Sequence, residues 1–320
     1  MAVQEIDRSK IDRPAAASRL RALRRSPACW TVVALLVAAV GACACVVAIG
    51  LFLSAPSRAV IGAPPSDLSA EPVAIASASG AMLHGWFVAG RPGGGAVVLL
   101  HRVRANRLSM LRRARLLQAA GFSVLLFDFQ AHGESAGARI TFGRLEGMDA
   151  AAAVAFVRQR LPTERIGVIG TSLGGAAALL APAPLPIDAL VLEAVYADIG
   201  TAVANRIRSV LGWHLGGEIL ARPLGRLFEF LLPPFLGVGP ADLRPIDHIG
   251  RISLPVLVAT GTRDDRATIA ESTALFERVR GPKLFWAAEG AEHVDLELHA
   301  PDEYRRHVLS FLIEKLQQPR

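Results

Sequence analysis

The sequence predicts an α/β protein built on a mostly parallel sheet that helices cover on both faces. Short, continuously apolar runs alternate with longer helix-forming stretches along most of the chain, as is typical of parallel strands buried on both sides. This alternation breaks at about 198–249, which predicts an inserted helical cap. A long apolar run near the N-terminus predicts one transmembrane helix ahead of the domain.

The apolar run covers residues 29–53 and is long enough to cross a hydrocarbon core of ~30 Å. Seven cations precede it: Arg8, Lys10, Arg13, Arg19, Arg21, Arg24 and Arg25. This asymmetry predicts a cytoplasmic N-terminus and export of the remaining chain. A cleaved signal peptide is the alternative, but such peptides have apolar segments of about 7–15 residues. An uncleaved signal anchor is favoured, although cleavage within 54–59 stays open.

The predicted organisation follows from these boundaries. A cytoplasmic basic tail (1–28) leads into the transmembrane signal anchor (29–53). A linker rich in proline, serine and alanine (54–71) then joins it to the α/β domain (72–320), with the cap at about 198–249. The expected location is the cell membrane, crossed once, with the domain on the extracytoplasmic side, either periplasmic or on the outer face.

Charge and cysteine content limit the function of the exported part. The formal net charge is +7, but it falls to about +3 without the tail, so nucleic-acid binding is not indicated. Cys29, Cys43 and Cys45 all lie at or within the apolar run, so the exported domain has no disulfide and no thiolate metal site. The sequence gives no sign of oligomeric state.

The elements of the domain follow in order, and glycine or proline punctuates them. The first two strands form a hairpin that turns at Ser79-Gly80. One helix stops at Gly121 and another before Pro162. Strands are expected at 72–78, 82–88, 96–100, 123–127, 166–169, 189–192, 255–260 and 283–287, and helices at 108–120, 146–160, 176–180, 268–280 and 301–316. Functional residues of such sheets lie beyond the carboxyl ends of the strands.

The stretch Gly170-Thr171-Ser172-Leu173-Gly174 fits G-x-S-x-G between a buried strand and an alanine-rich helix. In this context the serine occupies a strained turn that exposes its hydroxyl, beside the helix N-terminus. We therefore predict that Ser172 is a nucleophile. A second copy of the pattern, at 133–137, does not follow a strand directly and leads into no clean helix, so Ser135 is expected to be a loop or capping serine.

A nucleophilic serine needs a base and a residue that orients the base. Asp264 follows the strand at 255–260 and is the predicted orienting acid. Asp265 is the alternative, and an aspartate here is also a common helix cap. His293 follows the last strand and is the predicted base. The other histidines considered are His84, His214, His248, His299 and His307, which lie in the hairpin, the insert or the last helix.

With Ser172, Asp264 and His293 in this order, residues 72–316 resemble the α/β-hydrolase superfamily, and more narrowly its bacterial membrane-anchored serine hydrolases of the esterase and lipase type. Three further motifs carry the resemblance: 127–135 is similar to D-x-R-G-H-G-x-S with Gln130-Ala131 in place of Arg-Gly, 143–149 to G-x-x-E-x-x-D, and 192–194 to the strand end that opens the cap. The resemblance implies the α/β-hydrolase fold, with a helical cap.

One position departs from the family. The strand at 96–100 should lead into His-Gly but leads into His101-Arg102-Val103. The resemblance implies that the backbone N–H groups of Val103 and Leu173 form an oxyanion hole, with His101 and Arg102 next to the substrate. Arg102 either disturbs this hole, at a cost of about 3–4 kcal/mol if one donor is lost, or holds an anionic group of the substrate.

The cap alternates apolar runs with arginines. This pattern fits an acyl-binding wall or lipid-facing surface, and equally a helical cap packed on the core with its arginines in solvent. The leading hypothesis is a membrane-anchored serine hydrolase of small-molecule carboxylic esters or lipids, including thioesters, with no metal and no organic cofactor. Acyl transfer on the same fold and a catalytically weak membrane-tethered binding module are the alternatives.

Overall fold

The computed structural model describes residues 27–211 and 217–317. The seven cations of the tail and His214 lie outside these ranges. The chain divides into two compact units, residues 1–48 and 49–320. Helix α2 (Pro27–Ser54) contains the whole apolar run and ends in the second unit. Among the described residues it is the one helix long and apolar enough to cross a membrane.

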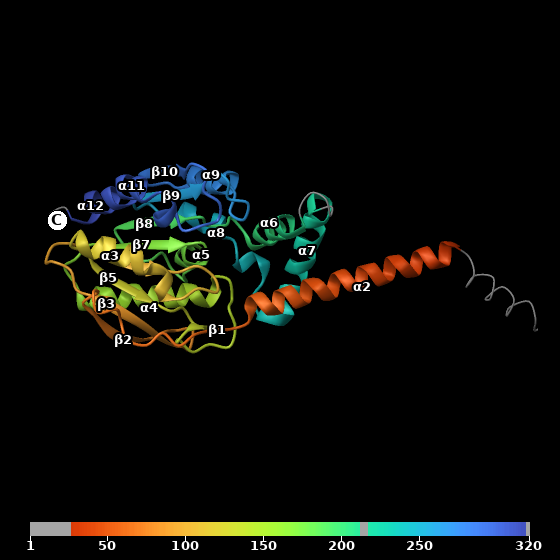
Figure 1. The fold of residues 1–320 in the computed structure, drawn as a ribbon, viewed down its shortest axis with the longest axis horizontal. Coiled ribbons are helices and arrows are strands. Elements are labelled where there is room, and N and C mark those ends of the chain that lie inside the picture. The colour runs from red at the N-terminus through yellow and green to blue at the C-terminus, as the bar shows by residue number, and fades with distance from the viewer. Residues whose placement is uncertain (1–26, 212–216, 318–320) are drawn as a thin grey trace, which may run out of the picture. The chain divides into compact units, whose positions relative to one another are not determined.

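The second unit is built on an eight-stranded sheet with the order β10-β9-β8-β7-β4-β5-β3-β2. Only β3 runs against its neighbours; β2 and the other six strands point the same way (Figure 1). The strands are β2 (Ala70–Ala76), β3 (Met82–Val88), β4 (Ala96–Leu100), β5 (Ser123–Phe127), β7 (Ile166–Thr171), β8 (Ala189–Glu193), β9 (Val256–Gly261) and β10 (Lys283–Ala288). All eight lie within two residues of the predicted ranges, and the mostly parallel sheet is confirmed.

Helices cover both faces of this sheet, as the apolar strands require. On one face, α3 (Leu111–Ala119) and α12 (Ser310–Leu316) pack on alternate strand residues such as Val97, Leu99 and Ile169. On the other face, α4 (Arg144–Arg160) packs beside α5 (Leu173–Leu179). The remaining core helices are α9 (Ile269–Arg278), α10 (Leu296–His299) and α11 (Pro301–Tyr304), which a π-helical segment at Arg305–Leu309 joins to α12.

The insert is helical, with α6 (Ile199–Leu211), α7 (Gly217–Leu236) and the short α8 (Pro245–His248). Helices α6 and α7 pack on each other beyond the carboxyl end of β7 (Figure 1). The two backbones approach closely at Gly225, where an added Cβ would lie 3.2 Å from the Gly200 carbonyl oxygen. Within α7, the side chain of Phe228 is buried, whereas that of Phe230 is exposed. The cap therefore has both a packed apolar face and apolar side chains in the open.

The stretch predicted as a linker (54–71) makes specific contacts with the domain. Residues Ser57–Arg58 form β1, which pairs in parallel with β6 (His132–Gly133). The Glu134 carboxylate then accepts hydrogen bonds from the backbone N–H groups of Ile61 and Gly62, both at 3.0 Å. Leu68 is buried in the core of the α3 face. Proline and serine content indicates irregular backbone, but it does not reveal such pairing with a distant loop.

A buried carboxylate joins the hairpin to the rest of the fold. The side chain of Asp149, in α4, accepts hydrogen bonds from Ser77 Oγ at 2.6 Å, Ser79 Oγ at 2.5 Å and the Gln130 N–H at 2.8 Å. Burial raises the pKa of Asp149 from 3.8 to about 6, against the lowering effect of these hydrogen bonds. Because the folded-state pKa is raised, the stability from this group is complete below pH 4 and is lost as pH rises through 6.

We predict that Asp149→Asn, which does not titrate, removes this pH dependence. Relative to the wild type, the variant should gain up to about 3 kcal/mol between pH 4 and pH 7.5, since one pKa unit corresponds to about 1.4 kcal/mol. Thermal unfolding in neutral detergent at both pH values measures the difference. A difference in Tm between variant and wild type that stays constant across this range would contradict the assignment.

Candidate active site

The turn at Ser172 joins β7 to α5 in a strained conformation. Ser172 has φ 52° and ψ −112°, outside the regions that L-residues normally occupy. Its N–H donates to the Glu193 carbonyl of the neighbouring strand at 2.8 Å, and its carbonyl accepts the first hydrogen bond of the helix, from Ala176, at 3.0 Å. Leu173 is the first residue of α5, so its N–H precedes the intrahelical hydrogen bonds. The turn therefore directs the serine side chain and a backbone donor to the same side.

Glycine makes this turn sterically possible. A Cβ on Gly170 would lie 2.5 Å from the Gly175 Cα, and one on Gly174 would lie 2.2 Å from the Leu100 carbonyl oxygen. Both distances are far shorter than any real Cβ contact, so strand, helix and β4 approach each other only because the side chains are absent. The pattern that predicts the elbow is thus explained by these two close backbone approaches.

His293 and Asp264 lie together, on the loops after β10 and β9. The imidazole Nδ1–H of His293 donates to Asp264 Oδ2 at 2.8 Å, which leaves Nε2 available on the other side of the ring. Asp264 Oδ1 accepts from the N–H groups of Arg266 and Ala267, at 2.9 and 2.8 Å. Asp264 thus contacts the histidine and closes its own loop, whereas the cap of α9 is Thr268, whose side chain accepts from the Glu271 N–H. Asp265 is exposed and makes no hydrogen bond with His293.

Ser172, His293, Leu173, Val103 and Arg102 all line one pocket of about 390 Å³. No hydrogen bond joins the Ser172 and His293 side chains in the described chain, and catalytic hydrogen bonds are often long until substrate binds. Arg102 is exposed at this pocket and has no positive φ, so a side chain fits where the resembled family has glycine. Predicted residues that follow β4, β7 and β10 thus converge on one cavity, and Asp264, after β9, contacts His293 from behind.

His101 and Asp264 are the two predicted residues outside the pocket lining, and Asp264 reaches it only through His293. His101 has a different place. It is fully buried and does not line the pocket. Its Nδ1–H donates to the Arg102 carbonyl at 2.8 Å, and its Nε2 accepts from the Phe129 N–H at 3.0 Å. Burial, with His132 nearby, lowers the pKa of His101 well below its usual range, so the ring stays neutral with one tautomer. His101 therefore lies behind the loop that carries Val103 and fixes that loop to the end of β5.

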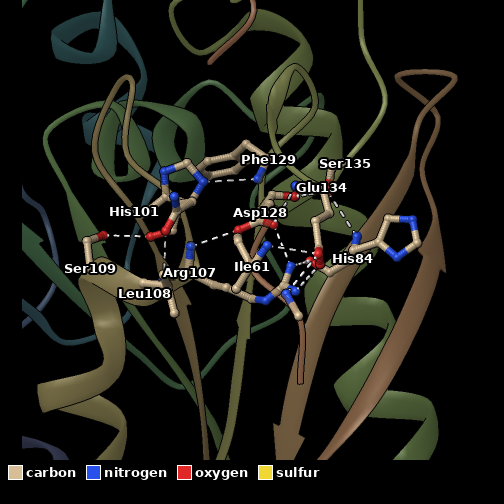
Figure 2. A network of polar contacts seen from close by, with 12 residues as sticks. Ile61, His84, His101, Arg107, Leu108, Ser109, Asp128, Phe129, Glu134 and Ser135 are labelled. Atoms are coloured by element: carbon tan, nitrogen blue, oxygen red, sulfur yellow. Dashed lines mark hydrogen bonds and ion pairs between the residues drawn. The ribbon is translucent and has the colours of Figure 1, made fainter. Parts of the chain in front are cut away.

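Sequence reasoning missed the ion pairs under this loop. Figure 2 shows the guanidinium of Arg107 between the carboxylates of Asp128 and Glu134. Arg107 Nη1 lies 2.5 Å from Asp128 Oδ2, and the guanidinium also stacks over the Trp86 ring at 4.7 Å. Asp128 also accepts from the Arg107 backbone N–H at 2.7 Å. These contacts hold the turn after Val103 against the end of β5, and no local pattern announces them.

A second buried network connects the serine elbow with the histidine loop. Arg113 Nη2 donates to Glu193 Oε2 at 2.7 Å, and Nη1 donates to Asp295 Oδ2 at 2.8 Å. Glu193 also accepts from Thr171 Oγ1 at 2.9 Å, next to Ser172. The signal in the sequence was Arg113 itself, which interrupts the apolar stripe of α3 between Met110 and Leu117 and therefore needed a buried partner.

Comparisons with known proteins indicate which family this chain resembles. Residues 92–226 match the Hydrolase_4 family model, described as serine aminopeptidase, S33. YqkD of Bacillus subtilis is 28% identical over 242 residues, covering 74% of this chain and 77% of that protein. The α/β hydrolase domain-containing protein WAV2 of Arabidopsis thaliana is 28% identical over 256 residues, covering 77% and 79%.

Solved structures give the same result. An esterase of Pyrococcus furiosus superposes with a TM-score of 0.65 at 26% identity, covering 82% of this chain and 97% of that one. An esterase from Exiguobacterium antarcticum, at 15% identity and a TM-score of 0.54, shares the fold. The family model includes the elbow and the Val103 loop but ends before Asp264 and His293.

We predict that Gly174→Ala destabilises the domain although alanine is normally the better helix residue. The added Cβ meets the Leu100 carbonyl, so overpacking should cost about 1–3 kcal/mol. Gly250→Ala is the matched control, because its Cβ would have 3.7 Å to the nearest atom, the Arg278 carbonyl oxygen. Thermal unfolding of both variants measures the effect, and equal Tm values would show that the elbow tolerates a side chain there.

Proposed function

We propose that this chain, a hydrolase with the α/β-hydrolase fold, is a membrane-anchored serine hydrolase of carboxylic esters. The observation that supports this most is the pocket shared by Ser172 and His293, with Asp264 hydrogen-bonded behind the histidine. A serine on a strained turn, an imidazole with a free Nε2 and two nearby backbone donors are what acyl transfer through an acyl-enzyme requires.

In the proposed reaction, Ser172 Oγ attacks the ester carbonyl carbon while His293 Nε2 takes the hydroxyl proton. Negative charge develops on the carbonyl oxygen, and the N–H groups of Leu173 and Val103 stabilise it. The C–O bond to the alcohol then breaks, and His293 returns the proton to the leaving oxygen. Water, deprotonated by His293, attacks the acyl-serine carbonyl; the bond from that carbon to Ser172 Oγ then breaks, His293 returns the proton to Oγ, and the acid leaves. Asp264 keeps the imidazole in the tautomer that these steps need.

The substrate side of the proposal comes from the pocket lining. Leu53, Phe142, Ile199 and Val203 give it a largely apolar wall. Apolar walls with a few convergent polar groups suit a lipophilic ester or thioester better than a sugar or a peptide. Leu53 belongs to the last turn of α2, so the C-terminal end of that helix contributes to the wall.

The membrane assignment rests on α2 and the cations before it. We propose that residues 29–53 form an uncleaved signal anchor and that residues 72–320 lie on the extracytoplasmic side. Within the second unit, Arg104 Nη1 donates to the carbonyl oxygens of Phe52 and Ala55, at 2.8 and 3.4 Å. The end of the anchor helix is thereby capped by a residue of the loop that carries Val103.

We predict that activity depends on Asp264 and not on its neighbour Asp265. Ser172→Ala should lower kcat on 4-nitrophenyl butyrate by roughly 10⁶-fold, and Asp264→Asn by about 10⁴-fold, because the amide favours the wrong histidine tautomer. Asp265→Asn, one residue away and exposed, should stay within about twofold.

Full-length protein in neutral detergent provides the assay. Equal losses in the two aspartate variants would overturn the assignment of Asp264. No hydrolysis of any ester in a series of rising chain length, by folded wild type, would instead favour a membrane-tethered binding module.

The orientation makes a separate prediction. Alkaline phosphatase fused after residue 60 should be active, since it folds only outside the cytoplasm, while green fluorescent protein at the same junction should stay dark. Replacing the six arginines and one lysine of the tail by glutamine should weaken this bias, because it is set by positive charge. A fluorescent fusion with an inactive phosphatase would refute the proposed side.

A further inference from the structure

Three arginines at the pocket form no ion pair with any residue that the structure describes. Arg102, Arg206 and Arg266 line the cavity beside Ser172 and His293, and its lining includes no aspartate or glutamate among the residues described. In that part of the chain the three guanidinium groups make no hydrogen bond and no ion pair. Arg104, the fourth arginine of the lining, differs because it binds the carbonyl oxygens at the end of α2.

Two of these cations are held together by the fold. Arg206 lies on α6, and its neighbour Asn205 is buried. Asn205 Nδ2 donates to the Arg266 carbonyl at 3.0 Å and to Glu271 Oε2 at 2.7 Å. These hydrogen bonds tie the first cap helix to the loop that begins with Asp264. The backbone segments that carry Arg206 and Arg266 are therefore held together at the pocket that both side chains line.

This proximity is unfavourable without a ligand. Burial, and then repulsion from Arg266, lowers the pKa of Arg206, with Asp265 opposing the shift. Solvent-exposed arginines normally spread apart or pair with carboxylates, whereas these remain unpaired around a cavity. Guanidinium groups bind carboxylate and phosphate through charge-assisted, often paired hydrogen bonds. An anion in the pocket would relieve the repulsion.

The rest of the lining indicates the chemistry of the remaining part of an anionic ligand. Phe142, Ile199, Val203 and Leu53 face the same cavity, whose volume of about 390 Å³ lies in the range of small-molecule sites. The pocket therefore combines an apolar wall with a cationic side, next to Ser172.

We propose that the substrate is an amphiphilic ester that carries a carboxylate or phosphate group, bound by Arg206 and Arg266 of the cap side and by Arg102 of the oxyanion loop. The proposal rests on the function proposed above and adds its specificity. The apolar part of the ester lies along the wall, and the anionic part fixes which carbonyl reaches Ser172. Arg102, which stands in place of a glycine, then serves recognition.

A matched pair of esters tests this. Mono-4-nitrophenyl glutarate is anionic, and 4-nitrophenyl pentanoate is neutral with the same acyl chain length. Full-length wild type in neutral detergent should show higher kcat/KM for the anionic ester, with a preference that weakens as salt rises. In the double variant Arg206→Gln, Arg266→Gln, the ratio of kcat/KM for the anionic ester to kcat/KM for the neutral ester should fall about tenfold, because hydrogen bonds to the charged group are lost. The value of kcat/KM for the neutral ester should stay within twofold.

Arg226→Gln is the control, because Arg226 is an exposed arginine of α7 outside the pocket lining. It should leave the preference unchanged. An equal preference in wild type and double variant, or a wild type that favours the neutral ester, would overturn the proposal. If the neutral ester is cleaved and Ser172→Ala abolishes this, the proposed function stands even when the specificity fails.

A binding readout keeps the test independent of catalysis. Hexyl phosphate should raise the Tm of wild type and of Ser172→Ala alike, hexanol should not, and the double variant should lose the response. No response to hexyl phosphate in either protein would overturn the anion site. Nanodiscs then distinguish the source of the anion: suppression of the response by phosphatidylglycerol, but not by phosphatidylcholine, identifies a lipid headgroup, and equal responses identify a soluble ester.

Discussion

The strained turn at Ser172 is the constraint on which the rest of the site depends. Its backbone lies at φ 52°, and the Ser172 N–H is anchored on the neighbouring strand by the Glu193 carbonyl. Such a conformation persists only where the surroundings determine it. Here they do, because Gly170 and Gly174 let the strand, the helix and β4 approach to distances that no side chain permits. Everything else in the pocket is arranged around the hydroxyl that this turn presents.

Buried polar contacts carry this constraint to the other loops. Arg113 links Glu193, beneath the elbow, with Asp295, two residues after His293. His101 and Arg107 hold the Val103 loop against the end of β5. Removing one partner of a buried ion pair leaves a charge without compensation, which typically costs about 3–5 kcal/mol. These networks therefore determine loop positions, and so the distances between groups that come from four different strands.

The sequence predicted the features that local chemistry specifies. Continuously apolar runs identified the strands, and the glycine spacing around Ser172 identified the elbow. The order of Asp264 and His293 after the last two strands predicted a pair that the structure brings to 2.8 Å. Features that depend on distant contacts could not be predicted in this way. The pairing of β1 with β6, the burial of His101 and the convergence of Arg206 with Arg266 each join segments whose proximity arises only from the complete fold.

The most direct test of the central claim is to locate the reactive residue chemically. Full-length protein in neutral detergent is treated with a fluorophosphonate, digested and mapped by peptide mass spectrometry. We expect one adduct, on Ser172, in folded protein and none after heat denaturation, because reactivity requires His293 and the strained turn. An adduct at another serine, such as Ser135, or a folded protein with no adduct at all, would contradict it.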